Sequence, residues 1–424
     1  MMAIASFALP ASAAWIIAGI STAGVILRPF RVPEAIWAVA GAAMLVLLGL
    51  LSWQDAWRGV LKGLDVYLFL AGMMLIAELA RQEGLFDWLA ALAVARAGGS
   101  PQRLFVLVYA VGTLVTVFLS NDATAVVLTP AVYAAARAAG ATPLPYLLVC
   151  AFIANAASFV LPISNPANLV VFGDRMPALA VWLQLFALPS LVAILVTFAA
   201  LYLTQRRALG AETISSKPSR PQLARGGRLA AYGIVAIAFA LVGCSALNLD
   251  LGLPTFVCGA LTTALVLALN RQHPWRLLRE ISWSVLPLVA GLFVLVEAMV
   301  HTGVIAQLSQ WVATWAAQSP AAATWGSGVL VALATNLMNN LPVGLIAGSV
   351  VASDHLPVPI VAATLIGVDL GPNLSVTGSL ATILWLVALR REGIEVGTRQ
   401  FLCLGFLVMP PALLLAIAAL RLTL

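Results

Sequence analysis

Residues 367–386 read GVDLGPNLSVTGSLATILWL, and this stretch decides what kind of protein the sequence describes. Apolar residues surround an acid, Asp369, which is followed by the break Gly371-Pro372-Asn373. Proline lacks a backbone donor and clashes with the preceding turn, so a helix entering this stretch must end or kink there. An interrupted helix inside an apolar segment is tolerated in a membrane only where the freed backbone lies in protein or lines a water-filled cavity.

The composition of the whole chain indicates an all-α polytopic membrane protein. Of 424 residues, 62% are hydrophobic and only 9% are charged, whereas soluble chains carry about 25% charged residues. The apolar stretches are continuous rather than alternating, which argues against a transmembrane barrel. No GxxxxGK[ST] loop and no CxxC pair occurs, so we expect no P-loop ATP site, no bound metal and no cofactor. The 22 Lys and Arg lie between apolar segments, a pattern of membrane topology rather than nucleic-acid binding.

The sequence contains a repeat that divides it into residues 1–203 and residues 229–424. The pattern G-x5-E-x5-G at 72–84 recurs 219 positions later at 291–303, and Asn121 recurs as Asn340. After a slip of six residues, Ser164-Asn165-Pro166 matches Thr377-Gly378-Ser379. We therefore expect two related halves joined by the basic linker 204–228.

The distribution of positive charge predicts that the two halves are inverted. If the linker is cytoplasmic and the segments 104–136 and 322–350 are re-entrant hairpins, each half crosses the membrane five times. This arrangement places 18 of the 22 Lys and Arg on the cytoplasmic side, as the positive-inside rule requires. We expect two inverted repeats, each of about five transmembrane helices and one re-entrant hairpin, surrounded by membrane lipids. Both termini should lie on the outer side of the membrane.

Four interruptions fall at matching places in the two halves, at 120–122, 161–166, 339–342 and 369–379. Paired broken helices in inverted repeats point to a substrate site at the membrane midplane. One such motif could equally be a helix-packing contact, but four in two related pairs favour a site. The candidate substrate-binding residues are Ser120, Asn121, Asp122, Ser164, Asn165, Asn168, Asn339, Asn340, Thr377, Gly378 and Ser379.

Acids within apolar segments are rare in this chain, and they are Glu78, Asp122, Glu297 and Asp369. Glu78 and Glu297 lie close to helix ends, one turn from Arg81 and His301 respectively, and favour paired or interfacial acids. Asp122 and Asp369 stand on interrupted backbone, where a buried carboxylate is costly and therefore a candidate for function. We expect Asp369 to be the main proton carrier, and Asp122 to be a substrate ligand or a second proton site.

These motifs resemble those of the bacterial arsenite/antimonite efflux permeases of the ion-transporter superfamily. The matching stretches are SNDATAVVLTP (120–130), FIANAASFVLPISNPANLVVF (152–172), NLMNNLPVGL (336–345) and GVDLGPNLSVTGSLATILWL (367–386). The resemblance implies a bacterial inner-membrane protein that exports arsenite and antimonite in exchange for protons, sometimes with a soluble ATPase partner. The chain departs from the family at Asn373, where members often carry Lys, and at 121–125, which read NDATA where many members begin NDGAA.

The residues suit a neutral trihydroxide, as the resemblance implies for arsenite, better than they suit an anion. Such a solute offers O–H donors, and Asn carbonyls, unwound backbone and an Asp supply acceptors. A citrate or succinate would be repelled by two acids with no Lys or Arg at mid-membrane. Two alternatives stay open: a Na⁺/H⁺ antiporter of similar fold, because the same oxygens suit Na⁺, and a carboxylate carrier of the same superfamily, against which the two acids count. No GxSxG or HExxH motif occurs, so we expect a transporter rather than an enzyme.

Overall fold

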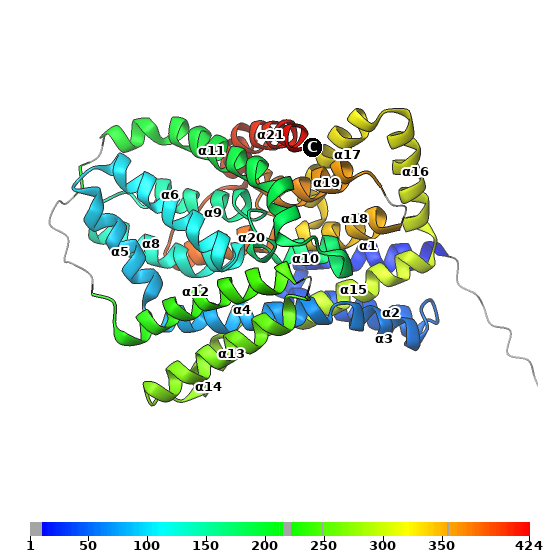
Figure 1. The fold of residues 1–424 in the computed structure, drawn as a ribbon, viewed down its shortest axis with the longest axis horizontal. Coiled ribbons are helices and arrows are strands. Elements are labelled where there is room, and N and C mark those ends of the chain that lie inside the picture. Colours follow the sequence, from blue (N-terminus) through cyan, green and yellow to red (C-terminus); the bar gives the residue numbers. More distant parts are fainter. Residues whose placement is uncertain (1–10, 212, 215–221, 248, 354–355) are drawn as a thin grey trace, which may run out of the picture.

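The computed structural model describes residues 11–211, 213–214, 222–247, 249–353 and 356–424, and these form helices and turns with no strand (Figure 1). The expected all-α fold is confirmed. The helices of the first half are α1 Ala11–Leu27, α2 Glu34–Leu47, α3 Trp53–Lys62, α4 Leu64–Gln82, α5 Leu85–Ala97, α6 Pro101–Phe118, α7 Asn121–Ala123, η2 Thr124–Leu128, α8 Thr129–Ala138, α9 Leu144–Ala156, α10 Pro166–Phe172 and α11 Leu179–Ala211, with short 3-10 turns η1 Pro29–Arg31, η3 Pro162–Ser164 and η4 Gly173–Arg175.

The second half repeats this order of helices. It consists of α12 Arg225–Ala246, α13 Gly252–Leu269, α14 Pro274–Glu280, α15 Val285–His301, α16 Val304–Gln318, α17 Pro320–Met338, α18 Asn340–Ser353, α19 Val358–Leu370, η5 Gly371–Leu374, α20 Leu380–Arg391 and α21 Thr398–Thr423. Helix α11 extends through the first eight residues of the expected linker 204–228, and α12 begins inside it. Residues 212 and 215–221 of that linker lie outside the described residues.

Several of these helices are suited to crossing a membrane. Among the described residues, α6, α11, α12, α13, α17 and α21 are long and apolar enough, and two bent pairs raise the number to eight. The bent pairs are α3 with α4, at 46°, and α14 with α15, at 42°. Length and composition thus allow α6 and α17 to span by themselves, and their placement in re-entrant hairpins remains a prediction.

Helix boundaries follow the sequence repeat closely. Helices α5 and α16 each begin after a glycine in the left-handed region, Gly84 at φ 73° and Gly303 at φ 80°, which a side chain rarely adopts. Helices α6 and α17 each begin with a serine cap followed by proline, at Ser100 and Ser319. The scaffold is therefore duplicated in structure as well as in sequence.

The two halves interleave instead of packing as separate bodies. Helix α4 of the first half lies against α13, and α15 of the second half lies against α2 and α3. A side chain on Gly259 would come within 2.5 Å of the Gly72 carbonyl oxygen, so α4 and α13 approach closely through glycine. Ion pairs reinforce this exchange, because Lys62 of α3 reaches Glu297 of α15 at 2.7 Å.

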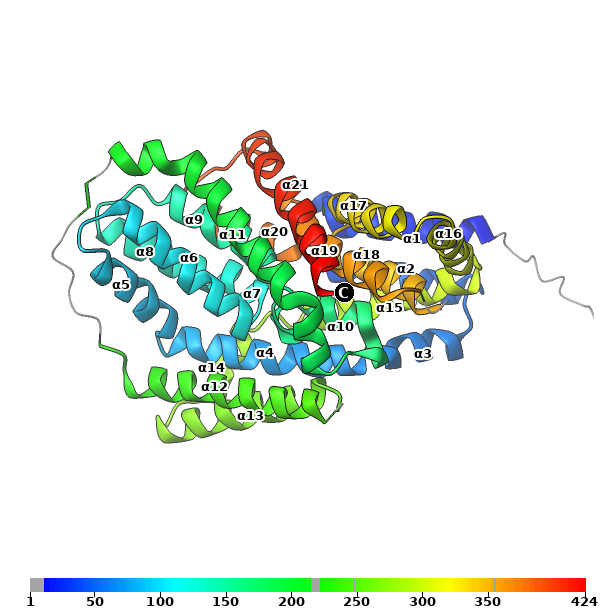
Figure 2. The same ribbon diagram turned by 45° about the horizontal axis from the view of Figure 1, so that its top comes forward.

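The interrupted helices occupy the middle of the molecule. Figures 1 and 2 show α9, α10, α19 and α20 between one flank made of α5, α6 and α8 and another made of α16, α17 and α18. Every residue of α9 from Pro145 to Ala156 is buried, and so is every residue of α19 from Ala362 to Leu370. Their ends, where the helices break, therefore meet inside protein, as freed backbone groups in a membrane require.

Candidate functional site

Residues from three of the four interruptions, together with the first residues of α20 after the fourth, line one cavity, the polar pocket. It encloses about 280 Å³ of empty space, and its walls are Leu70, Asn121, Asp122, Asn165, Pro166, Val285, Asn340, Leu341, Leu380 and Ala381. Asn121 and Asn340, which are related by the repeat, each begin the helix after a break, at α7 and α18. The chain enters α7 through the extended residue Ser120, and it enters α18 through Asn339 at φ 72°. These two breaks therefore bring both asparagines to the same cavity.

The polar pocket continues into a larger cavity, the vestibule, of about 750 Å³ between α4, η2, α20 and the turn that joins α14 to α15. Leu70, Asp122, Pro166, Val285 and Leu380 line both cavities. The mouth of the vestibule carries Glu78 and Glu280, beside Arg81, which lies 2.5 Å from Glu78 and 3.9 Å from Glu280. Arg81 is one of the residues that the charge distribution places on the cytoplasmic side.

The chemistry of the polar pocket is that of amides and one carboxylate. In the described part of the chain, no hydrogen bond occupies the Asp122 carboxylate, the Asn340 side chain or Asn121 Nδ2, while Asn121 Oδ1 accepts from the Asp122 backbone at 2.9 Å. Directly after Asp122 the backbone makes a π-helical turn, η2, a local widening often found at functional sites. Neither cavity is lined by a Lys or an Arg. The pocket can accept O–H donors and donate N–H groups, and it offers nothing to balance an anion.

Asp369 does not reach the cavity but lies behind its wall. Its side chain is fully buried. Its Oδ1 lies 2.6 Å from Ser158 Oγ, at hydrogen-bond distance, and accepts from Asn165 Nδ2 at 2.5 Å. Asn165 in turn lines the polar pocket and caps α10 by accepting from Ala167 at 3.0 Å. The connection between Asp369 and the pocket therefore runs through Asn165.

Sequence reasoning missed three buried polar residues of this region, Asn155, Ser158 and Asn373. Asn155 donates to Asn373 Oδ1 at 3.0 Å, and Asn373 donates to the Phe152 carbonyl at 3.0 Å, so the end of α9 is tied to η5. The signal was present in IANAASFVLP, where polar residues directly precede the Pro162 break. Asn373, singled out only as a departure from the family, joins the two halves.

Other predicted site residues stabilise the breaks and do not line the polar pocket. Asn168 donates to the carbonyls of Ser158, Leu161 and Pro162, and Ser164 donates to the Val117 carbonyl at 3.0 Å. Ser120 caps α7 and lines the vestibule.

In the second half, the predicted residues around Gly378 stabilise the breaks in the same way. Thr377 donates to the Asn336 carbonyl at 3.0 Å, and Ser379 caps α20. Asn339 lies 3.5 Å from the Thr377 carbonyl, and the Asn340 backbone donates to the Gly378 carbonyl at 2.9 Å. A side chain on Gly378 would come within 2.5 Å of Pro372 Cα, so the close approach requires glycine.

The acids near helix ends are paired, as expected. Glu78 accepts from Arg81 and from Gln82, the latter at 2.6 Å. Glu297 accepts from Lys62, and His301 lies 3.9 Å away. Glu297 thus joins the two halves, whereas Glu78 is paired within its own helix α4.

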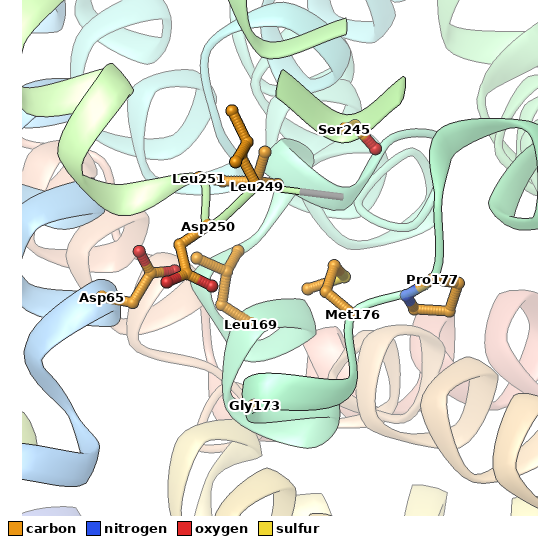
Figure 3. Close-up of a pocket in the computed structure, with 9 residues that line it drawn as sticks. All are labelled: Asp65, Leu169, Gly173, Met176, Pro177, Ser245, Leu249, Asp250 and Leu251. Atoms are coloured by element: carbon orange, nitrogen blue, oxygen red, sulfur yellow. The ribbon is translucent and has the colours of Figure 1, made fainter. Parts of the chain in front are cut away.

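A separate pocket of about 440 Å³ lies near the opposite end of α4 (Figure 3). Figure 3 shows the carboxyl groups of Asp65 and Asp250 near each other, beside Leu169 and Gly173 of the α10 region. Asp65 accepts from the Gly252 backbone at 2.6 Å. None of the predicted site residues lines this pocket.

Comparison with known proteins decides the family. A family model described as CitMHS, citrate transporter, matches residues 13–367. The chain belongs to this family. A CitMHS chain is a membrane transporter, and several of its helices are long and apolar enough to cross a membrane, so this is a multi-pass membrane protein.

Among the CitMHS chain's relatives are proteins named arsenical pump membrane protein. The one from Yersinia enterocolitica is 29% identical over 385 residues, which cover 88% of each chain. One from Escherichia coli is 27% identical over 403 residues, covering 91% of this chain and 93% of the relative. The predicted resemblance to arsenical permeases is thereby confirmed. In structure, the chain is similar to the Alcanivorax borkumensis YdaH transporter, with a TM-score of 0.53, 16% identity and 86% of each chain covered, a likeness of fold alone.

Proposed function

We propose that this protein exports arsenite, and antimonite of the same chemistry, from the cytoplasm in exchange for protons. The observation that carries the proposal is the polar pocket, where two repeat-related asparagines and one unbonded carboxylate face a small cavity that contains no cationic residue. A neutral trihydroxide donates O–H groups to the Asp122 carboxylate and the Asn340 carbonyl, and it accepts N–H groups from Asn121. The arsenical relatives support the same substrate class.

The position of the vestibule supports the proposed direction of transport, out of the cytoplasm. It reaches the polar pocket from the end of α4 that carries Arg81, the side that the charge distribution makes cytoplasmic. Substrate from the cytoplasm therefore has an open route to Asp122. We further propose that the linker 204–228 is cytoplasmic, that the halves are inverted, and that the protein resides in a bacterial inner membrane.

The proton gradient is the proposed source of energy. Asp122 on the pocket wall and Asp369 behind it are the two acids that take part, Asp369 as the main carrier and Asp122 as substrate ligand or second proton site. Moving one proton down a membrane potential supplies about 2.3 kcal/mol per 100 mV, and an uncharged substrate costs nothing against that potential. A soluble ATPase on the linker would be an added energy source, and the chain alone should transport without it.

Uptake into everted membrane vesicles tests this function. Vesicles that carry the protein should accumulate arsenite when energised, and they should lose it when a protonophore collapses the gradient. The vesicles should not accumulate citrate, and citrate should not compete with arsenite for uptake, although the matching family model is described as a citrate transporter. Accumulation of citrate, or collapse of an imposed ΔpH by NaCl in place of arsenite, would contradict the proposal.

A further inference from the structure

The hydroxyl of Ser158 lies between two oxygen atoms that cannot both accept from it. Ser158 Oγ is 2.6 Å from Asp369 Oδ1 and 2.7 Å from the Asn155 carbonyl oxygen. A hydroxyl has a single hydrogen, and a carbonyl oxygen only accepts. Both contacts are therefore hydrogen bonds at the same time only if Ser158 donates to Asn155 and the Asp369 carboxyl group donates to Ser158.

The surroundings of Asp369 hold no positive charge that would balance an ionised carboxylate. Within the described residues, the helices α9, α10, α17 and α18, which pack against α19, contain no Asp, Glu, Lys, Arg or His, and the titratable groups among them are Tyr146 and Cys150 of α9. Helices α11 and α21 also contact α19. Their ionisable residues are Tyr202, Arg206, Arg207, Arg399, Cys403 and Arg421, and no ion pair joins any of them to Asp369. Buried charges in proteins are paired or neutralised.

The same cluster has more acceptors than donors. Asp369 Oδ2, Asn155 Oδ1 and Asn168 Oδ1 are buried and have no hydrogen-bond partner in the described structure. A negative charge on Asp369 would add to this excess, whereas a proton would reduce it. Leaving a buried acceptor unsatisfied costs about 1–3 kcal/mol, so the count of donors favours the carboxylic acid.

We propose that Asp369 is protonated in this structure and donates a hydrogen bond to Ser158. In this proposal Ser158 is a positioning residue that couples the protonation state of Asp369 to the substrate pocket. The inference deepens the proposed proton coupling and rests on it. When the proton leaves, the Ser158 hydroxyl turns from Asn155 to the new carboxylate. Asn165 donates to the same Asp369 oxygen and lines the polar pocket. Loss of the proton therefore strengthens the hydrogen bond that Asn165, a residue of the pocket wall, donates to Asp369.

Infrared difference spectroscopy of the purified full-length protein tests this inference without any substrate. Titration from acid to alkaline pH should remove the carbonyl stretch of a protonated carboxylic acid. Because every Asp and Glu contributes to that band, Asp369→Asn should remove one component of it, and Asp122→Asn should leave that component in place. In Ser158→Ala this component should move to higher frequency, because the acid loses its acceptor, and in Ser158→Thr, which keeps the hydroxyl, it should return to the wild-type position. Ser379→Ala is the matched control, since this buried serine caps α20 and has no contact with Asp369.

The possible results are distinct. An infrared difference spectrum that loses no component in Asp369→Asn, or an Asp369 component that stays in place in Ser158→Ala, overturns the inference. Because this readout needs no arsenite, failure of wild-type vesicles to transport arsenite would overturn the proposed substrate and leave the infrared result to decide the role of Ser158. Should Ser158→Ala fail to fold, Ser158→Cys serves in its place, because a thiol is a weaker acceptor and should also shift the Asp369 component.

Discussion

The broken helices of the two halves are arranged alike, but each half places its acid differently relative to the polar pocket. In the first half, Asp122 follows Asn121 and faces the polar pocket. The related position in the second half is Leu341, and the acid of that half, Asp369, is sealed behind Asn165. The duplicated helices thus supply two asparagines to one pocket, while the two acids meet it differently, one directly and one through an amide.

A second difference concerns the residues that follow the longer breaks. Asn165 and Gly378 are related by the repeat. Asn165 extends a side chain across the interface to Asp369, whereas Gly378 offers only its carbonyl, which holds the Asn340 backbone. The first half therefore connects the pocket wall to an acid, and the second half holds the Asn340 backbone in place. Substitutions that exchange or remove these features test the contrast.

The largest expected effect is an all-or-none difference in the side of the membrane from which two introduced cysteines can be labelled. Gln54 and His273 are exposed, stand 219 positions apart, and lie at the starts of the related helices α3 and α14. In a background without the four native cysteines, Gln54→Cys should react with an impermeant maleimide only from outside, and His273→Cys only from the cytoplasm. Labelling of both from one side would mean that the halves are parallel, and the comparison of their breaks would need another geometry.

The next largest effect is expected for the sealed acid. Asp369→Asn should reduce proton-driven arsenite uptake into everted vesicles by about a hundredfold or more, because an amide cannot cycle a proton. Exchange of arsenite down its own gradient should persist, since the pocket wall is unchanged. If Asp369→Asn keeps full gradient-dependent uptake and Asp122→Asn loses it, the roles of the two acids are reversed.

A smaller effect is expected for the related asparagines. Asn121→Ala and Asn340→Ala should each raise the half-saturating arsenite concentration by roughly tenfold, the value of one hydrogen bond to the substrate. Membrane insertion should stay normal, because among the described residues the Asn121 side chain bonds only to the adjacent Asp122 backbone and no hydrogen bond is made by the Asn340 side chain. Ser190→Ala, which removes a hydroxyl bonded to the Ala187 carbonyl within α11, is the control and should leave that concentration unchanged. Wild-type affinity in both asparagine variants would place the site elsewhere.

The smallest effect is expected for Gly378→Ala. Its Cβ would lie 2.5 Å from Pro372 Cα, and such overpacking costs about 1–3 kcal/mol, so the melting temperature in detergent should fall by a few degrees. Gly397→Ala is the matched control, since no atom lies within 4 Å of its Cβ and its φ is −70°. Equal melting temperatures for the two variants would show that the second-half break tolerates a side chain.

The sequence predicted the helical membrane fold, the repeat and the places of all four breaks, because apolar length, proline and glycine act locally. It also predicted that Glu78 would pair with Arg81, since a helical turn brings them together. It could not predict that Asn121, Asn165 and Asn340 share a cavity with Asp122 while Thr377 and Ser379 do not. That distinction depends on how four distant breaks are oriented after the helices pack.

The hidden position of Asp369 shows the same limit. Flanking Gly371 and Pro372 indicate unwound backbone, but whether an acid on it faces a cavity or a neighbouring helix depends on residues some 200 positions away. Ser158 and Asn155 supply those contacts, and in sequence they are two small polar residues at the end of an apolar helix. No local pattern separates them from ordinary packing residues.

The exchange of helices between the halves also has a consequence for biosynthesis. When the ribosome finishes residue 203, α4 has yet to meet α13, and Lys62 has no Glu297 with which to pair. The newly inserted first half must wait in the bilayer with its Gly72 face uncovered. These contacts can therefore form only after α13 and α15 have been synthesised, so the packing of the first half depends on helices made later.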